Sequence, residues 1–256
     1  MAHTGLDIDT ASGIGLAVST VIFALRRDER GAPTVWLPLV RRTREPYLGR
    51  WALPGGMVRV DESLEGAARR NLGETTRLEP AYLEQLYAFG DVDRSPDQRM
   101  VSIVYWALVR PDEAERVTLG ENVRWFAADD LPDLAFDHNL IVDYALWRLR
   151  TKMEYSAIAH AFLGPRFTLA ELREVYEAVL QRPLDPANFR RQMETSGVIE
   201  PTGEVVTGGR HRPPRLYRYT GAVDLVDAGP LNRRTAREPR TAPDTSTATE
   251  HLRTSA

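Results

Sequence analysis

The sequence predicts an α+β chain with two folded domains, a larger N-terminal domain built on a mixed sheet and a smaller, helix-rich C-terminal domain. In the first half, several strand-like runs surround a single early helical segment. In the second half, two helices with clear start and stop signals follow one another closely. The length of 256 residues, with 43% hydrophobic and 27% charged residues, is typical of a globular chain with room for both domains.

The N-terminal domain is predicted over residues 14–152, after a flexible N-terminus of residues 1–13. The β-branched run at Leu16–Arg27 and the run at Thr34–Arg41 flank a polar turn that contains Gly31 and Pro33, so they form a hairpin. The remaining elements of this domain are strands at Tyr82–Phe89 and Val101–Val109, a helix at about Ser63–Thr76 and a helix that starts near Asp137. We expect an α/β/α sandwich with a mixed sheet.

The C-terminal domain is predicted over residues 153–227. Thr168 and Glu171 have the spacing of a capping box, which starts a helix at about Leu169. A second helix starts at Asp185-Pro186 and ends before Gly197. Two capped helices joined by a short turn are typical of a helix-turn-helix.

A basic hairpin follows these helices, with strands predicted at Val198–Glu200, Glu204–Thr207 and Leu216–Tyr219. Helix-turn-helix and hairpin together predict a winged helix that binds DNA. The candidate DNA-binding residues are polar or basic side chains of the second helix and arginines of the wing: Asn188, Arg190, Arg191, Gln192, Thr195, Arg210, Arg212 and Arg215. Arginine can pair with guanine, and Asn or Gln with adenine, although phosphate contact or a solvated basic loop of an oligomerisation domain stays open.

Composition excludes several classes of protein. The chain has no Cys, so disulfide scaffolds and thiolate metal sites are excluded, and Lys152 is its only lysine. No apolar run is long enough for a membrane helix and no signal-peptide pattern is present, so we expect a cytoplasmic protein. Residues 228–256 are rich in Pro, Thr, Arg and Ser and are expected to be disordered.

The segment Trp51–Leu78 carries the main chemical signature of the N-terminal domain. A Pro-Gly-Gly turn leads through a loop into a helix, an arrangement that can present carbonyls and carboxylates to a metal–diphosphate. The segment resembles the Nudix box, with matches at Gly56, Glu62, Arg70, Leu72, Glu74 and Leu78. The resemblance implies the Nudix fold and, in active members, helix carboxylates that hold Mg²⁺.

Two of the carboxylates that the resemblance implies are missing from this chain. Asn71 and Thr75 stand where the Nudix pattern has Glu, and Arg77 replaces its late Gly. Metal-assisted hydrolysis needs that negative charge. We therefore expect a vestigial box without catalytic residues, no required cofactor, and at most weak Mg²⁺ beside a bound nucleotide, with Glu74 as the only candidate ligand.

Candidate effector-binding residues lie around this box: Arg41, Arg42, Trp51, Gly55, Gly56 and Glu74. The arginines, with nearby Arg44, can meet phosphates, but a solvated strand end explains them equally well. Trp51 can stack on a base, although core packing is the commoner use of such a residue. The charged loop with Asp91, Asp93, Arg94 and Asp97 can border the cleft, and His138 is given no chemistry.

The combination of a degenerate Nudix domain and a winged helix resembles the NrtR-type, Nudix-related transcriptional regulators of NAD metabolism. The resemblance implies a homodimeric repressor that binds palindromic operators near NAD biosynthesis or salvage genes. It also implies that ADP-ribose or a related NAD-derived nucleotide is the signal.

Two other classes of function stay open at this point. The chain can be a weak Nudix hydrolase of ADP-ribose, with Glu115 or Glu121 assisting Glu74. It can also be a metabolite-binding protein whose C-terminal domain binds another protein.

Overall fold

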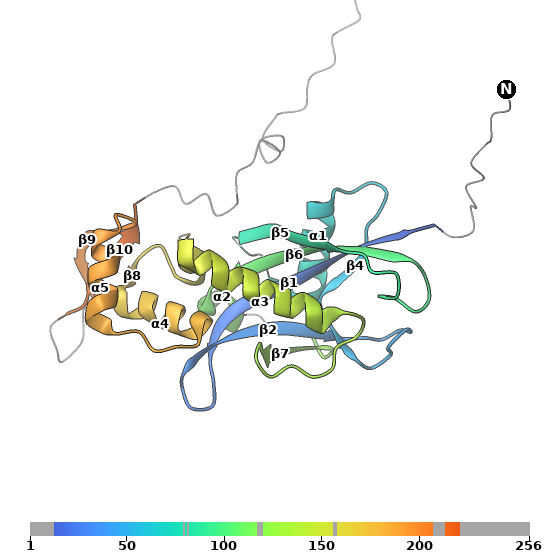
Figure 1. Cartoon of the computed structure of the whole chain (residues 1–256), viewed down its shortest axis with the longest axis horizontal. Helices are drawn as coiled ribbons and strands as arrows, with labels where there is room; N and C mark the ends of the chain where they lie inside the picture. Colours follow the sequence, from blue (N-terminus) through green and yellow to red (C-terminus); the bar gives the residue numbers. More distant parts are fainter. Residues whose placement is uncertain are drawn as a thin grey trace, which may run out of the picture. The chain divides into compact units, whose positions relative to one another are not determined.

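The computed structural model describes residues 13–78, 80, 82–116, 120–155, 158–206 and 213–220, as Figure 1 shows. Predictions for the flexible N-terminus, for the tail at residues 228–256, and for Arg210 and Arg212 of the wing therefore lie outside the described residues. Within the described part, no helix is both long enough and apolar enough to cross a membrane.

The N-terminal domain is built on a mixed sheet whose central pair is β1 and β6. The path of the sheet is β3-β2-β1-β6-β5, with β4 added to β1 and β7 added to β2. The strands are β1 (Gly15–Arg27), β2 (Pro33–Arg41), β3 (Trp51–Ala52), β4 (Gly55–Met57), β5 (Tyr82–Phe89), β6 (Met100–Val109) and β7 (Val123–Ala127). The β1–β2 pair is the predicted antiparallel hairpin, whereas β1 and β6 are parallel.

Helices cover both faces of this sheet, which confirms the predicted α/β/α sandwich. Alternate residues of β1 enter two different cores, because successive side chains of a strand point to opposite faces. Val21 and Phe23 join the core that includes α3 (His138–Tyr155), and Ile22 joins the core that includes α1 (Leu64–Thr76). A short helix, α2 (Pro111–Arg116), follows β6.

The C-terminal domain is a winged helix, as predicted. A 3₁₀ helix (Ile158–Phe162) leads into a three-stranded sheet of order β8-β10-β9 that packs with two helices. Its elements are β8 (Phe167–Thr168), α4 (Leu169–Leu180), α5 (Pro186–Thr195), β9 (Ile199–Val205) and β10 (Arg215–Tyr219). The capping box of Thr168 and Glu171 is present, and Asp185 caps α5 through Asn188 N.

One detail of the wing differs from the sequence prediction. The separate strands predicted at 198–200 and 204–207 form one strand, β9, which passes through Gly203 in the left-handed region at a φ of 84°. Glycine adopts that conformation without steric cost, so the Pro-Thr-Gly stretch does not end the strand.

Helix α3 links the two domains. It continues past Lys152 to Tyr155, so the boundary predicted at residue 152 falls inside a helix. Lys152 is buried and pairs with Glu84 of β5 at 2.6 Å between Nζ and Oε2. Arg150 of α3 donates to the carbonyl of Val179 in α4 at 3.1 Å, a direct contact between the domains.

Candidate functional site

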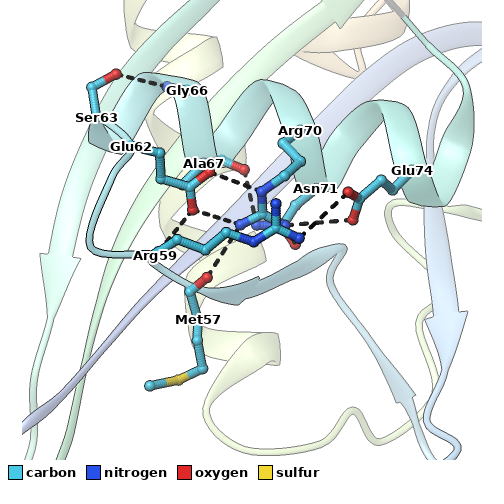
Figure 2. Close-up of polar contacts among 9 residues, drawn as sticks. All are labelled: Met57, Arg59, Glu62, Ser63, Gly66, Ala67, Arg70, Asn71 and Glu74. Carbon is cyan, nitrogen blue, oxygen red and sulfur yellow. Dashed lines mark hydrogen bonds and ion pairs between the residues drawn. The ribbon is translucent and has the colours of Figure 1, made fainter.

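The loop before α1 and the first turns of α1 form a tight network of ion pairs, shown in Figure 2. Arg70 donates two hydrogen bonds to Glu62, from Nε at 2.8 Å and from Nη2 at 2.6 Å. The Arg70 hydrogen bonds, with a further one from the Arg59 backbone N–H, lower the pKa of Glu62 to about 2. Glu62 is therefore an ionised anchor that fixes the loop against the helix.

Glu74 lies on the exposed side of the same network. Its carboxylate is 3.4 Å from Arg70 Nη1 and 3.9 Å from an Arg59 Nη2. The Glu74 side chain is 59% exposed and lines neither of the two cavities described below, although the sequence predicted it as an effector-binding residue. Of the sequence-predicted box residues, Glu62, Arg70 and Glu74 are thus brought together by one set of ion pairs.

Asn71 is turned into the helix rather than toward a ligand. Its Nδ2 donates to the carbonyl of Ala67 at 2.8 Å, and its Oδ1 accepts from Arg70 at 3.4 Å. A Cβ added to Gly56 would lie only 2.7 Å from this Oδ1, so a larger residue there would require the Asn71 side chain to shift. At the end of α1, Arg77 is in the left-handed region at a φ of 58°, where glycine is more favourable.

These residues do not fit a carboxylate-held Mg²⁺ site of the Nudix type. Mg²⁺ demands several oxygen ligands in near-octahedral geometry. Both box carboxylates are engaged by arginines, and in the described part of the chain no three His, Asp or Glu side chains converge to hold a metal. The amide of Asn71 is used inside the helix.

A cleft of about 440 Å³ opens beside β4 and the start of α3. Arg42, Gly55 and Gly56, three of the predicted effector-binding residues, line it. Gly55 is required by the close pairing of β4 with β1, because a Cβ there would lie 2.3 Å from the carbonyl oxygen of Val18. Arg94 and Asp97 of the charged loop also line the cleft, whereas Asp91 and Asp93 do not.

An aromatic cluster forms one wall of this cleft. The Arg42 guanidinium lies 4.7 Å from the ring centroid of Phe136, and Tyr47 contacts the same ring edge-to-face at 4.9 Å. Tyr47 and Phe136 both have left-handed backbone, at φ values of 65° and 58°, an uncommon conformation for aromatic residues that clusters at functional sites. Burial lowers the pKa of Arg42.

His138 is a functional candidate that sequence analysis missed. It is buried in the cleft wall, and its Nδ1 accepts from the Leu53 N–H at 3.0 Å. Burial lowers the pKa of His138 to about 3, so the ring is neutral at pH 7 and carries its proton on Nε2. Next to it, Asp137 forms a two-pronged ion pair with Arg94 at 2.7 and 3.0 Å.

A smaller cavity of about 220 Å³ adjoins the cleft and is lined by Arg41, Arg42, Arg44 and Thr75. Trp51 lines neither cavity. It packs edge-to-face on Phe126 at 5.0 Å between centroids, with Arg124 over its ring at 5.7 Å. Neither Glu115 nor Glu121 lines the cleft.

The second helix of the winged helix presents the predicted recognition face to solvent. Phe189 is buried under α5, and the five predicted residues are exposed: Asn188, Arg190, Arg191, Gln192 and Thr195. Arg191 is oriented by a hydrogen bond from Nη2 to Asn188 Oδ1 at 2.7 Å. Tyr217 of β10 donates to Glu194 at 2.8 Å, which fastens the helix to the wing.

The described part of the wing contains one of its three predicted arginines. Arg215 is exposed at the start of β10. Arg218, three residues further along β10, is paired with Glu200 at 2.6 Å.

Both domains of the chain match families of known proteins. Residues 15–144 match the Nudix domain, and residues 159–219 match the NrtR DNA-binding winged helix domain. The chain therefore belongs to the family of Nudix-domain proteins that carry an NrtR-type winged helix.

Three relatives show how far the similarity extends. The chain is 36% identical over 186 residues to the ADPR-responsive transcriptional repressor NtrR of Acinetobacter baylyi, which covers 71% of this chain and 74% of that protein. The structure of Shewanella oneidensis NrtR in complex with a 27mer DNA superimposes with a TM-score of 0.68 at 33% identity, over 82% of this chain and 94% of that one. An ADP-ribose pyrophosphatase of Methanocaldococcus jannaschii is 35% identical over 111 residues, 43% of this chain and 66% of the enzyme.

Proposed function

We propose that this protein is a transcriptional repressor that binds operator DNA through its winged helix and ADP-ribose, or a related NAD-derived nucleotide, through its Nudix cleft. The observation that carries the proposal is the similarity to the Acinetobacter repressor, which extends over 71% of the chain. We further propose that it acts in the cytoplasm as a homodimer on palindromic operators of NAD biosynthesis or salvage genes.

The exposed face of α5 supports the DNA-binding half of this proposal. Arg190 and Arg191 are exposed, and Asn188 and Gln192 offer amides that can pair with adenine. In a homodimer, two such helices would read half-sites about 34 Å apart, one turn of the duplex. The Arg191–Asn188 hydrogen bond orders the arginine before it meets DNA, which lowers the entropic cost of binding.

The box supports a sensor rather than an enzyme. With Asn71 and Thr75 in place of carboxylates, the charge that activates a metal-bound water is reduced, so a bound nucleotide is not consumed. A signal that survives binding can report its own concentration. The nucleotide can change DNA binding only if it binds the DNA-binding state and the non-binding state of the protein with different affinities. Operator DNA must then change the affinity for the nucleotide by the same factor.

Fluorescence anisotropy of a labelled duplex from the region upstream of the gene tests this function. We expect salt-sensitive binding whose affinity changes roughly 5- to 150-fold when ADP-ribose is added, the usual range of allosteric coupling. The control ligand is AMP, which lacks the diphosphate. An affinity that ADP-ribose leaves unchanged would remove the regulatory half of the proposal.

A weak ADP-ribose hydrolase is the second candidate, and the similarity to the archaeal pyrophosphatase favours it. Release of AMP from ADP-ribose with Mg²⁺ or Mn²⁺ discriminates between the two. Turnover that disappears in Glu74→Gln would favour the enzyme, whereas ligand binding without turnover favours the sensor.

A further inference from the structure

We propose that Arg41, Arg42 and Arg44 take the place of a divalent cation, so that the cleft binds the diphosphate of its nucleotide without metal. This inference rests on the proposed nucleotide-binding function. Because the box residues do not fit a Mg²⁺ site, the positive charge that meets a diphosphate has to come from other residues of the cleft.

The three arginines line the smaller cavity, which adjoins the cleft. They occupy the end of β2 and the loop that follows it. The smaller cavity and the cleft share Arg42 and Gly55 among their lining residues, so a ligand can extend from one into the other. Thr75 of α1 also lines the smaller cavity, and it occupies one of the two positions where the Nudix pattern has a carboxylate.

The guanidiniums of these arginines form no close ion pair among the described residues, but Arg42 also interacts at longer range with the carboxylates of Glu45 and Asp97, which line the cleft beside it. None of the three lies within 4.0 Å of a carboxylate in the part of the chain that the structure describes, which is the limit for an ion pair. Their hydrogen bonds go to neutral carbonyls instead: Arg41 Nε to Gly49 at 3.2 Å, and Arg42 Nε to Pro46 at 2.6 Å. Carbonyls orient a guanidinium and leave its charge available to an anion.

The arginines of the box region behave differently. Arg59, Arg69 and Arg70 each have a carboxylate partner, at 3.9, 2.9 and 2.6 Å. Arginines without a close carboxylate partner therefore gather in the smaller cavity, which Thr75 also lines. Because Thr75 lines this cavity, a carboxylate at position 75 would lie near the guanidiniums and compete with an anionic ligand for them.

Guanidinium groups suit a diphosphate for a chemical reason. Their planar donors bind phosphate oxygens bidentately and stay charged at every physiological pH. A bound cation supplies comparable charge only when carboxylates hold it in place. A cleft that has arginines and lacks metal-holding carboxylates can bind a diphosphate without metal.

Isothermal titration calorimetry of the full chain with ADP-ribose, in EDTA and separately in excess MgCl₂, tests the proposal. We expect the two affinities to agree within about twofold, and inorganic pyrophosphate in EDTA to compete with ADP-ribose. Binding that appears only with Mg²⁺ would overturn this inference and leave the proposed function standing. Binding under neither condition would overturn both.

Two test variants and one control variant show whether the residues of the smaller cavity bind the diphosphate. Arg44 is exposed, so Arg44→Gln folds, and we expect it to weaken ADP-ribose binding in EDTA by roughly 10- to 100-fold, the loss of one hydrogen-bonded charge. Thr75→Glu should weaken binding similarly, because its carboxylate neutralises the cavity. Arg69→Gln is the control, since Arg69 lies outside both cavities and is paired with Glu65. Wild-type affinity in both test variants would overturn the proposal.

Discussion

The ion-paired arginines around the Nudix box and the arginines of the recognition helix have opposite roles. Around the box and the cleft, Arg70 and Arg94 are locked into two-pronged pairs with Glu62 and Asp137. On α5, Arg190 and Arg191 are exposed and have no carboxylate within ion-pair distance in the described part of the chain. The comparison separates charge that holds a fold together from charge that is left for a partner.

The largest expected effect comes from a paired arginine. Arg94→Ala removes the partner of Asp137, whose side chain is 17% exposed while that of Arg94 is 4% exposed. An uncompensated buried charge costs about 3 kcal/mol or more. We expect the free energy of unfolding, measured in urea, to fall by that amount. Arg69→Ala, which breaks an exposed pair, should cost less than about 0.5 kcal/mol. Equal losses of unfolding free energy in the two variants would contradict the distinction between buried and exposed ion pairs.

The exposed Arg190 and Arg191 of α5 should contribute to DNA affinity and little to stability. The double variant Arg190→Ala, Arg191→Ala leaves the unfolding free energy within about 0.5 kcal/mol, because exposed side chains without partners contribute little. Its affinity for operator DNA should fall by roughly 30-fold or more, with a smaller salt dependence. Fluorescence anisotropy at two salt concentrations measures both. Unchanged DNA affinity would instead favour a protein partner for the C-terminal domain.

Acid should destabilise the folded protein through the buried His138. Its pKa in the folded protein is about 3, below the ordinary value of 6.5, so between these values the unfolded chain binds a proton that the folded chain does not. Stability from this residue is therefore complete above pH 6.5 and is lost as pH falls toward 3. From pH 7 to pH 5, wild type should lose about 2 kcal/mol more than His138→Gln, whose amide oxygen can accept from Leu53. Unfolding free energies, measured in urea, that fall equally with pH in wild type and His138→Gln would contradict this.

Local signals in the sequence predicted most of the fold. Helix α4 begins at Leu169 and α5 at Pro186 because capping residues and proline act within one turn. The short strands β3, β4 and β8 were not predicted, since two or three residues have no detectable period. Similarly, the parallel pairing of β1 with β6 depends on residues far apart in the chain.

The candidate site was predictable where a motif fixes it and not where contacts between distant segments do. The spacing of Glu62, Arg70 and Glu74 placed them on one network, as Figure 2 shows. His138 lines the cleft because its ring accepts from Leu53, 85 positions earlier, and no local pattern indicates this. For Trp51 the sequence left both base stacking and core packing open, and the structure has its ring against Phe126 and outside the cleft.

The smallest expected effect comes from a substitution that removes the carboxylate partner of an arginine. Arg218 on the wing is neutralised by Glu200 at 2.6 Å, and both side chains are exposed, so the pair adds little to stability. Glu200→Gln removes an acid next to the DNA-binding face and frees the guanidinium for a phosphate. We expect operator affinity to rise by about two- to fivefold and the salt slope to steepen by about 0.9, the value for one additional phosphate contact. Glu65→Gln, which frees Arg69 on the other domain, should change neither quantity. If both variants increased DNA affinity equally, net charge rather than the position of an open arginine would govern binding.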